Sequence, residues 1–229
     1  MVQVNSEKLF IRLKFRKTGN LQYISHLDLV RTMHKVIVRA DLPLWYTEGF
    51  NPKPKMIFAA PLSIGTESVA EFMDLRLTER MDPEEIMERL NRNMVADMQI
   101  CEAYYPESKF TDLKWLSYRM RFFSDAVSDD SCERINEVLS AERIEVKKKT
   151  DDKLIDIKPL IKSFEVSRHD GYIEIYTLLS ADPSAFLNPE YLVKALKDGA
   201  GILHAESLVS ERYSIMREKA YFADLSEFR

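Results

Sequence analysis

The part of the sequence that decides the fold is residues 8–40, KLFIRLKFRKTGNLQYISHLDLVRTMHKVIVRA. In its first nine residues apolar side chains alternate with basic ones: Leu9, Ile11, Leu13 and Phe15 lie between Lys8, Arg12, Lys14 and Arg16. A repeat of two residues is typical of a β-strand with one buried and one solvated face, so we expect the basic side chains to face solvent. From Ser25 the pattern changes and predicts a helix to about Ala40, because Ser25 is a good N-cap and Asp28 acts like the acidic member of a capping box.

The first half of the chain continues in the same way. Residues 69–77 alternate as a second strand, Asp82-Pro83-Glu84 is typical of a helix start, and residues 98–105 predict another strand. With the strand expected after Pro54, the order is strand, helix, strand, strand, helix, strand. This is the split βαβ arrangement called ferredoxin-like.

The second half repeats this scheme less clearly. Strands are predicted at 115–123, at 163–168 and 172–179 around the hairpin His169-Asp170-Gly171, and at 208–221, with helices before and after the hairpin. We therefore expect an α+β protein made of two tandem ferredoxin-like (split βαβ) domains. The predicted domains are residues 7–106 and 112–223.

Composition excludes several classes of protein. The chain has 229 residues, 45% of them hydrophobic and 31% charged, which is typical of a globular protein. No apolar run approaches the roughly 20 residues that span a bilayer, and the N-terminus does not resemble a signal peptide, so we expect a cytoplasmic protein without a membrane partner. Two cysteines and four scattered histidines give no metal-ligand spacing, and we expect neither a metal nor a cofactor.

Charge is distributed unevenly along the chain. Residues 8–58 contain ten lysines and arginines against three acidic residues, a net charge of +7, whereas the whole chain carries −4. Such asymmetry favours a surface for a polyanion or an acidic protein, although a solvated face that only maintains solubility is the plain alternative.

The second unusual stretch is residues 44–55, which combine aromatic residues, two prolines and two lysines. Pro52 and Pro54 fix the backbone on either side of Lys53 and present Lys53 and Lys55 from a stiff chain. Aromatic rings beside cations are suited to stacking on bases of single-stranded nucleic acid, although an aromatic residue next to a proline turn also commonly serves as a hydrophobic plug. The candidates from this stretch are Tyr46, Phe50, Asn51, Lys53 and Lys55.

Further candidates come from the strand and the helix of residues 8–40. Lys14 and Arg16 lie on the expected polar face of the strand, and Arg31 and Lys35 belong to a basic stripe along the helix that is suited to contact phosphates or to keep the helix soluble. His26 lies in the first helical turn, where backbone amides favour anions, and this position suits either a functional or a purely structural role. Whether these residues meet the lysines of residues 53–55 depends on the fold.

The motifs resemble a known family. They are Lys14–Arg31, Arg39-Ala40-Asp41-Leu42-Pro43, Gly49–Lys55, Pro61–Ser68, Leu90-Asn91 and Asp156–Ile161. They are similar to the radical-SAM-linked protein family, a bacterial domain family of unknown function. The resemblance implies a stand-alone version of a domain often fused to, or encoded beside, a cobalamin-binding radical-SAM protein, frequently near genes for RNA processing. It supplies no catalytic residues.

Three hypotheses follow. The leading one is a protein that binds RNA, or presents it as a substrate, as an accessory to a radical-SAM modification enzyme, with no catalysis of its own. The first alternative is a metal-independent RNA endonuclease in which His26 is the general acid or base. The second alternative is a protein-interaction module that docks on the radical-SAM partner.

Overall fold

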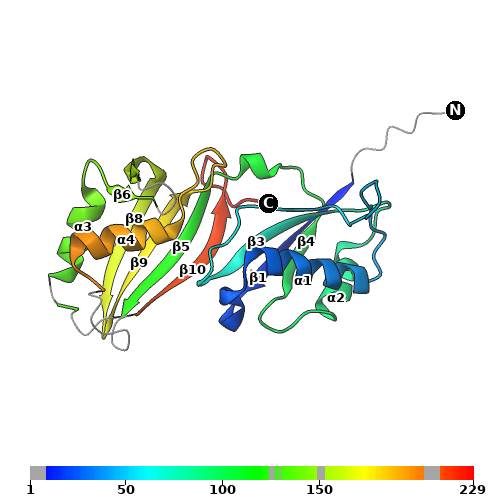
Figure 1. Cartoon of the computed structure of the whole chain (residues 1–229), viewed down its shortest axis with the longest axis horizontal. Coiled ribbons are helices and arrows are strands. Elements are labelled where there is room, and N and C mark those ends of the chain that lie inside the picture. The colour runs from blue at the N-terminus through cyan, green and yellow to red at the C-terminus, as the bar shows by residue number, and fades with distance from the viewer. Residues whose placement is uncertain (1–8, 124–126, 129, 149–152, 204–211) are drawn as a thin grey trace. The chain divides into compact units, whose positions relative to one another are not determined.

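The computed structural model describes residues 9–123, 127–128, 130–148, 153–203 and 212–229 (Figure 1). These residues form two compact units. The first runs to Phe110 and includes Arg229, and the second runs from Thr111 to Phe228.

The first unit contains strands and helices in the order that the sequence predicts. The elements are β1 (Phe10–Lys17), a short 3₁₀ helix (Gly19–Tyr23), α1 (His26–Arg39), β2 (Met56–Phe58), β3 (Thr66–Arg76), α2 (Pro83–Asn91) and β4 (Ile100–Tyr104). Antiparallel pairing gives the strand order β4-β1-β3, and β2 pairs with the other edge of β3. This order is consistent with a ferredoxin-like split βαβ unit.

The second unit contains β5 (Trp115–Phe123), α3 (Ser131–Ser140), β6 (Glu145–Lys147), β7 (Leu154–Asp156), β8 (Ile161–His169), β9 (Tyr172–Ser180), α4 (Pro189–Ala200) and β10 (Arg212–Tyr221). Its strand order is β10-β5-β9-β8, again consistent with a split βαβ unit, and β6 and β7 form a separate hairpin between α3 and β8. The α+β class and the hairpin turn at residues 169–171 are confirmed. Residues 208–211 of the last predicted strand lie outside the described residues.

One face of the first sheet carries both helices. Ile11, Leu13 and Phe15 of β1 share a core with α1, α2 and the inward side chains of β3, and Met56 and Phe58 of β2 pack against that core. Because side chains alternate along a strand, the intervening residues of β1 and β2 lie on the other face, which we call the helix-free face.

The expectation that Arg12 faces solvent is wrong. Arg12 lies on the helix-free face but is 0% exposed. It forms a two-point ion pair with Asp74 of β3, at 2.8 and 2.9 Å, and donates to the Ser108 hydroxyl at 2.8 Å. The segment that contains Ser108 and Phe110 covers this part of the face, since the guanidinium lies 4.3 Å from the centre of the Phe110 ring.

The predicted start of α1 is confirmed. The Asp28 amide donates to the Ser25 hydroxyl oxygen at 3.1 Å, and that hydroxyl donates to the Asp28 carboxylate at 2.7 Å. The helix ends before Asp41, which adopts a left-handed conformation with φ of 52°. Asparagine and aspartate tolerate this conformation better than most residues, although glycine suits it best.

Candidate nucleic-acid interface

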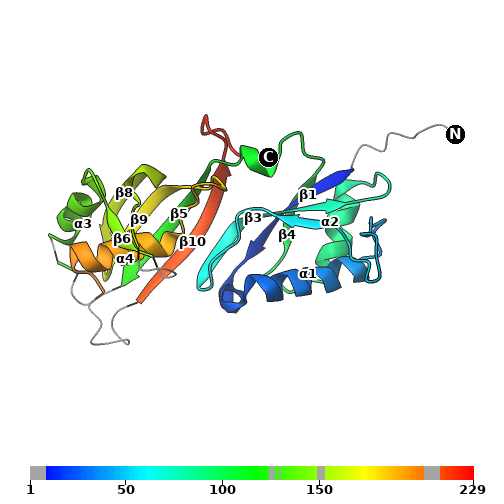
Figure 2. The same cartoon turned by 45° about the horizontal axis from the view of Figure 1, so that its top comes forward.

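The segment that leads into α1 and residues 44–55 lie at opposite ends of β3. At the start of α1, the Gly19 amide donates to Glu67 at 2.6 Å and the Gly65 amide to the Gln22 carbonyl at 2.9 Å, next to the start of β3. Residues 44–55 are instead bonded to Arg76, at the end of β3. A strand rises about 3.3 Å per residue, so these positions are separated by roughly 30 Å. Figure 2 shows the chain entering α1 at one end of the unit and leaving it at the other.

His26 belongs to the first of these regions. Its ring packs edge-on against Phe58, with ring centroids 5.4 Å apart and planes at 87°. The neighbouring Asp28 is bonded to Ser25 and Arg31, and both interactions hold the pKa of its carboxyl below the usual value. Asp28 is therefore committed to the helix start and does not serve as a proton-transfer partner of His26.

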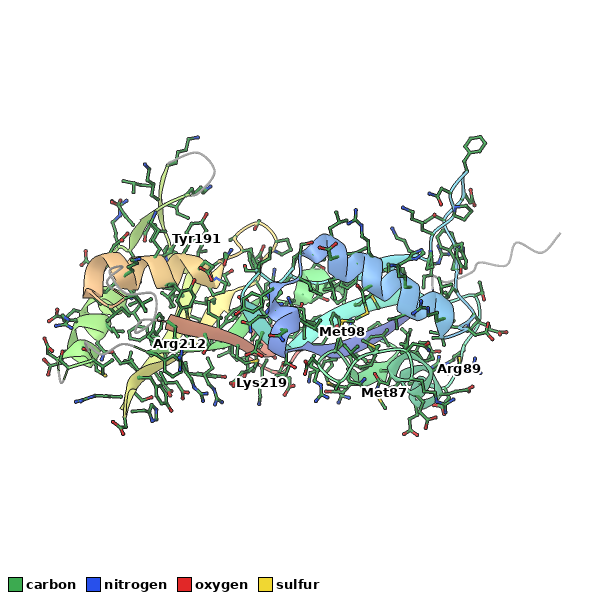
Figure 3. All side chains as sticks on the ribbon, turned by 60° about the horizontal axis from the view of Figure 1, so that its bottom comes forward. Met87, Arg89, Met98, Tyr191, Arg212 and Lys219 are labelled. Carbon is green, nitrogen blue, oxygen red and sulfur yellow. The ribbon has the colours of Figure 1, made fainter. Side chains whose placement is uncertain are left out.

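Residues 44–55 form a hairpin. The Thr47 amide donates to the Lys53 carbonyl at 2.9 Å, the Lys55 amide to the Trp45 carbonyl at 3.2 Å, and the Lys53 amide to the Thr47 hydroxyl at 3.1 Å. Gly49 turns the chain with φ of 121°, which favours glycine. The hairpin projects from the unit and carries its side chains outward (Figure 3). We call residues 44–55 the basic hairpin.

The basic hairpin exposes the side chains that the sequence singled out. Phe50 is fully exposed, Tyr46 is 43% exposed, and Asn51, Lys53 and Lys55 are exposed. Neither lysine has a carboxylate partner among the described residues. The hairpin therefore offers free positive charge beside free aromatic surface.

Sequence reasoning missed Arg76 and left Trp45 out of the site. The Arg76 guanidinium lies 3.9 Å from the centre of the Trp45 ring, and backbone bonds join both residues to Lys55. Arg76 comes from β3, more than twenty positions along the chain, so only the fold brings it to the hairpin. It adds a third cation without a carboxylate partner in the described part of the chain.

The cations of β1 are largely committed to structure. Lys14 forms an ion pair with Glu102 of β4 at 2.7 Å, and Arg16 donates to the Ala96 carbonyl at 2.8 Å. Together with the buried Arg12, these residues account for part of the charge surplus of residues 8–58. That surplus therefore overstates the charge available to a ligand.

The basic stripe of α1 lies on the solvent side of that helix. Arg31 pairs with Asp28 at 3.2 Å, whereas Lys35 and Arg39 are exposed and have no carboxylate partner among the residues that the structure describes. Since α1 covers one face of the sheet and Lys55 lies on the helix-free side, the stripe and the hairpin lysine belong to different faces. The structure does not gather all predicted binding residues into one site.

Two further kinds of site are absent from the described residues. No group of three or more histidine, cysteine, aspartate or glutamate side chains there is placed to hold a metal ion. In the same residues, no helix combines the length and apolar character needed to cross a membrane.

Comparisons with known proteins give a family but no activity. The family model described as "Uncharacterized protein conserved in bacteria (DUF2344)" matches residues 11–189. No curated protein matches the sequence.

Three of the solved structures that match this chain illustrate how weak the similarity is. A chain of "Crystal Structure of a Cbf5-Nop10-Gar1 Complex" has 11% identity and a TM-score of 0.48 over 92% of this chain and 48% of that one, so this chain spans about half its length. An unknown protein from Galdieria sulphuraria has 9% identity, a TM-score of 0.26 and coverages of 92% and 99%. DyPB from Rhodococcus jostii RHA1 has 8% identity, a TM-score of 0.22 and coverages of 92% and 93%. TM-scores this low carry no argument about function.

Proposed function

The chain belongs to the bacterial DUF2344 family, and we propose that it binds single-stranded RNA on the basic hairpin. The observation that carries this proposal is the combination at residues 44–55: a fully exposed Phe50 beside two lysines without carboxylate partners in the described structure. A solvated surface alone gives no reason to place a large aromatic ring at the tip of a projecting hairpin.

Each part of the hairpin has a role in this proposal. Lys53, Lys55 and Arg76 neutralise phosphates, which supplies affinity without base specificity. Phe50 and Tyr46 stack on unpaired bases, an interaction that single strands offer and duplexes do not. The hairpin bonds and the two prolines order these groups before binding, so less conformational entropy is lost on association.

We further propose that the bound RNA is presented to a partner enzyme. This role rests on the resemblance of the motifs to the radical-SAM-linked family, which implies a cobalamin-binding radical-SAM protein as the partner. Nuclease-treated pull-downs with that protein test the partnership. Retention after nuclease treatment supports direct contact between the proteins, and complete loss of the partner contradicts it.

The endonuclease alternative receives no support from the geometry. His26 lies at the other end of α1 from the basic hairpin, and its ring is packed against Phe58. Asp28, the nearest carboxylate in the same helical turn, is bonded to Ser25 and Arg31, so the geometry supplies no acid–base partner for His26.

RNA binding is tested by fluorescence anisotropy with a labelled, unstructured RNA. The double substitution Lys53→Ala, Lys55→Ala is expected to weaken binding about tenfold, because two phosphate contacts are lost. The matched control is Lys197→Ala, Lys219→Ala, which removes the same charge from exposed positions of the second unit. Equal affinities for the two double variants would contradict the proposal.

A further inference from the structure

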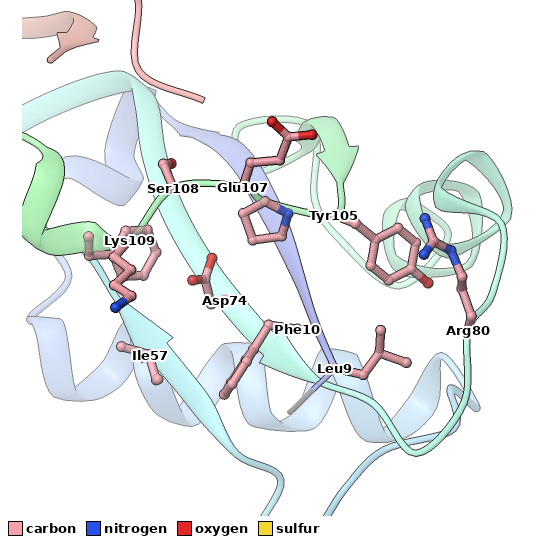
Figure 4. Close-up of a pocket in the computed structure, with 11 residues that line it drawn as sticks. Leu9, Phe10, Ile57, Asp74, Arg80, Tyr105, Glu107, Ser108 and Lys109 are labelled. Carbon is pink, nitrogen blue, oxygen red and sulfur yellow. The ribbon is translucent and has the colours of Figure 1, made fainter. Parts of the chain in front are cut away.

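The helix-free face of the first unit contains a cavity of about 580 Å³ (Figure 4). Apolar side chains from separate segments form its walls: Phe10 of β1, Ile57 of β2, and Pro106 and Phe110 from the segment after β4. The volume lies within the range of about 300–1,000 Å³ that is common for small-molecule sites. The cavity can therefore hold a planar ring system.

One side of the cavity is fixed before any ligand binds. The Tyr105 hydroxyl accepts a hydrogen bond from the Met81 amide at 2.9 Å and donates one to the Met81 carbonyl at 2.8 Å. The Arg80 guanidinium lies 4.1 Å from the centre of the Tyr105 ring. These contacts hold an aromatic wall and a cation in place, and Figure 4 shows Tyr105 and Arg80 next to each other.

A carboxylate lies at the floor of the cavity. Asp74 is opposite Ile57 in the pairing of β2 with β3, and it is only 8% exposed. Both of its oxygens accept hydrogen bonds from Arg12, at 2.8 and 2.9 Å. Burial nevertheless raises the pKa of Asp74, against the opposing effect of Arg12. The pair with Arg12 thus does not fully compensate the loss of water around this carboxylate.

The floor is selective for hydrogen-bond donors. An ionised carboxylate accepts about four hydrogen bonds, and the described residues supply two, both from Arg12. A ligand N–H group satisfies a remaining acceptor site and stabilises the buried charge, whereas a carbonyl oxygen at the same position meets only repulsion. At this position the floor therefore favours an amino group over a keto oxygen.

The cavity is close to the basic hairpin. Lys55 and Ile57 are two positions apart in the extended chain and point to the same face, which places their Cα atoms about 7 Å apart. A strand of RNA whose phosphates contact Lys55 can therefore turn one base toward the cavity.

We propose that this cavity binds an unpaired nucleobase with an exocyclic amino group, such as cytosine or adenine, from the RNA held by the hairpin. The apolar walls pack against the ring, and Asp74 accepts from the amino group. This inference rests on the proposed RNA-binding function and adds base preference to it.

The test compares oligocytidine with oligouridine, each about eight nucleotides long, in anisotropy titrations. At the ring position where cytosine carries an exocyclic amino group, uracil carries a carbonyl oxygen. Wild-type protein is expected to bind oligocytidine at least about fivefold more tightly. The substitution Ile57→Trp fills the cavity and should abolish this preference, while Ile64→Trp, at an exposed position outside the cavity lining, should retain it.

Asp74→Asn supplies a second check, because the amide can donate to uracil and should remove or reverse the preference. The Asp74→Asn variant leaves the buried Arg12 without its charged partner. If it does not fold for that reason, Ile57→Trp still tests whether the cavity sets the base preference. One possible result is that wild type binds both oligonucleotides equally well and that Lys53→Ala, Lys55→Ala weakens this binding. That result would overturn the cavity assignment and leave the proposed RNA binding intact. No binding of either oligonucleotide would overturn both.

Discussion

Phe50 is the single residue on which the proposed function depends most. It is fully exposed at the tip of the basic hairpin and contributes no buried surface to the fold. Stacking of a base on an aromatic ring is worth about 1–3 kcal/mol. We predict that Phe50→Ala weakens RNA binding by that amount and leaves the Tm unchanged. Anisotropy and thermal unfolding measure the two quantities, and Val95→Ala, at another exposed apolar position of the first unit, is the control.

Arg12 and Asp74 connect the fold to the inferred cavity. We predict that Arg12→Met lowers the free energy of unfolding of the first unit by about 3–5 kcal/mol, because it leaves a buried carboxylate without its partner. The double substitution Arg12→Met, Asp74→Leu removes both charges and should cost less. Urea unfolding in a Trp115→Phe background reports on the first unit through Trp45, since the chain has two tryptophans. A larger loss in the double variant would argue against a buried ion pair.

Asp182 gives the clearest prediction for pH. Lys114 donates a hydrogen bond to the Asp182 carboxylate at 2.6 Å. Ser184 donates two more to that carboxylate, through its amide at 2.9 Å and its hydroxyl at 2.7 Å. These hydrogen bonds hold the pKa of Asp182 well below its ordinary range. The unfolded-state pKa is about 3.9. The contribution of the ionised Asp182 carboxylate to the stability of the fold is therefore fully present above about pH 4. This contribution is lost as the pH falls through the pKa of Asp182 in the folded state.

We accordingly expect Asp182→Asn to lower the Tm at pH 7 and to match wild type increasingly well as the pH falls below about 4. Thermal unfolding of both proteins across this pH range measures the difference. A difference in Tm that is independent of pH would show that Asp182 acts through its shape rather than its charge.

Residue-level patterns in the sequence predict alternation but not what covers each face. The period of two correctly places Arg12 opposite Ile11 and Leu13. It does not show that Ser108 and Phe110, nearly one hundred positions away, close over the guanidinium. For the same reason Lys14 and Arg16 look like free binding residues in the sequence and prove to be bonded to Glu102 and the Ala96 carbonyl.

At the scale of elements, local signals predict local structure well. The Ser25 cap defines the start of α1, and Asp82-Pro83 does so for α2, because the groups that satisfy these helix ends are close in sequence. The basic hairpin is harder to predict, since its bonds to Arg76 are long-range. The sequence therefore identifies its residues as unusual without showing that they project from the fold or that Arg76 joins them.

The hairpin and the stripe of α1 allow a direct comparison between elements. Lys35 and Arg39 lie on the solvent side of the helix, on the other side of the sheet from Lys55. The double substitution Lys53→Ala, Lys55→Ala is expected to weaken RNA binding about tenfold. We predict that Lys35→Ala, Arg39→Ala weakens RNA binding by less than about threefold, which is half of that loss on a logarithmic scale. Anisotropy at one fixed salt concentration is the measurement. A larger effect of the helix variant would move the binding surface to α1.

At the scale of the whole molecule, charge along the chain is an incomplete guide to the surface. The surplus of +7 over residues 8–58 points to the half of the protein in which we propose the RNA site. The fold then uses Arg12 and Lys14 in pairs with carboxylates from outside this segment, Asp74 and Glu102. What remains for a ligand is concentrated on the basic hairpin and the outer side of α1.

We propose that phosphates contact the lysines of the basic hairpin, and the salt dependence of RNA binding tests this contact. The logarithm of affinity should fall linearly with the logarithm of salt concentration, with a slope of about −0.7 for each phosphate contact. We predict that Lys53→Ala, Lys55→Ala makes this slope less steep by about 1.4, whereas Lys197→Ala, Lys219→Ala leaves it unchanged. Identical slopes for wild type and both variants would show that these lysines do not contact phosphates.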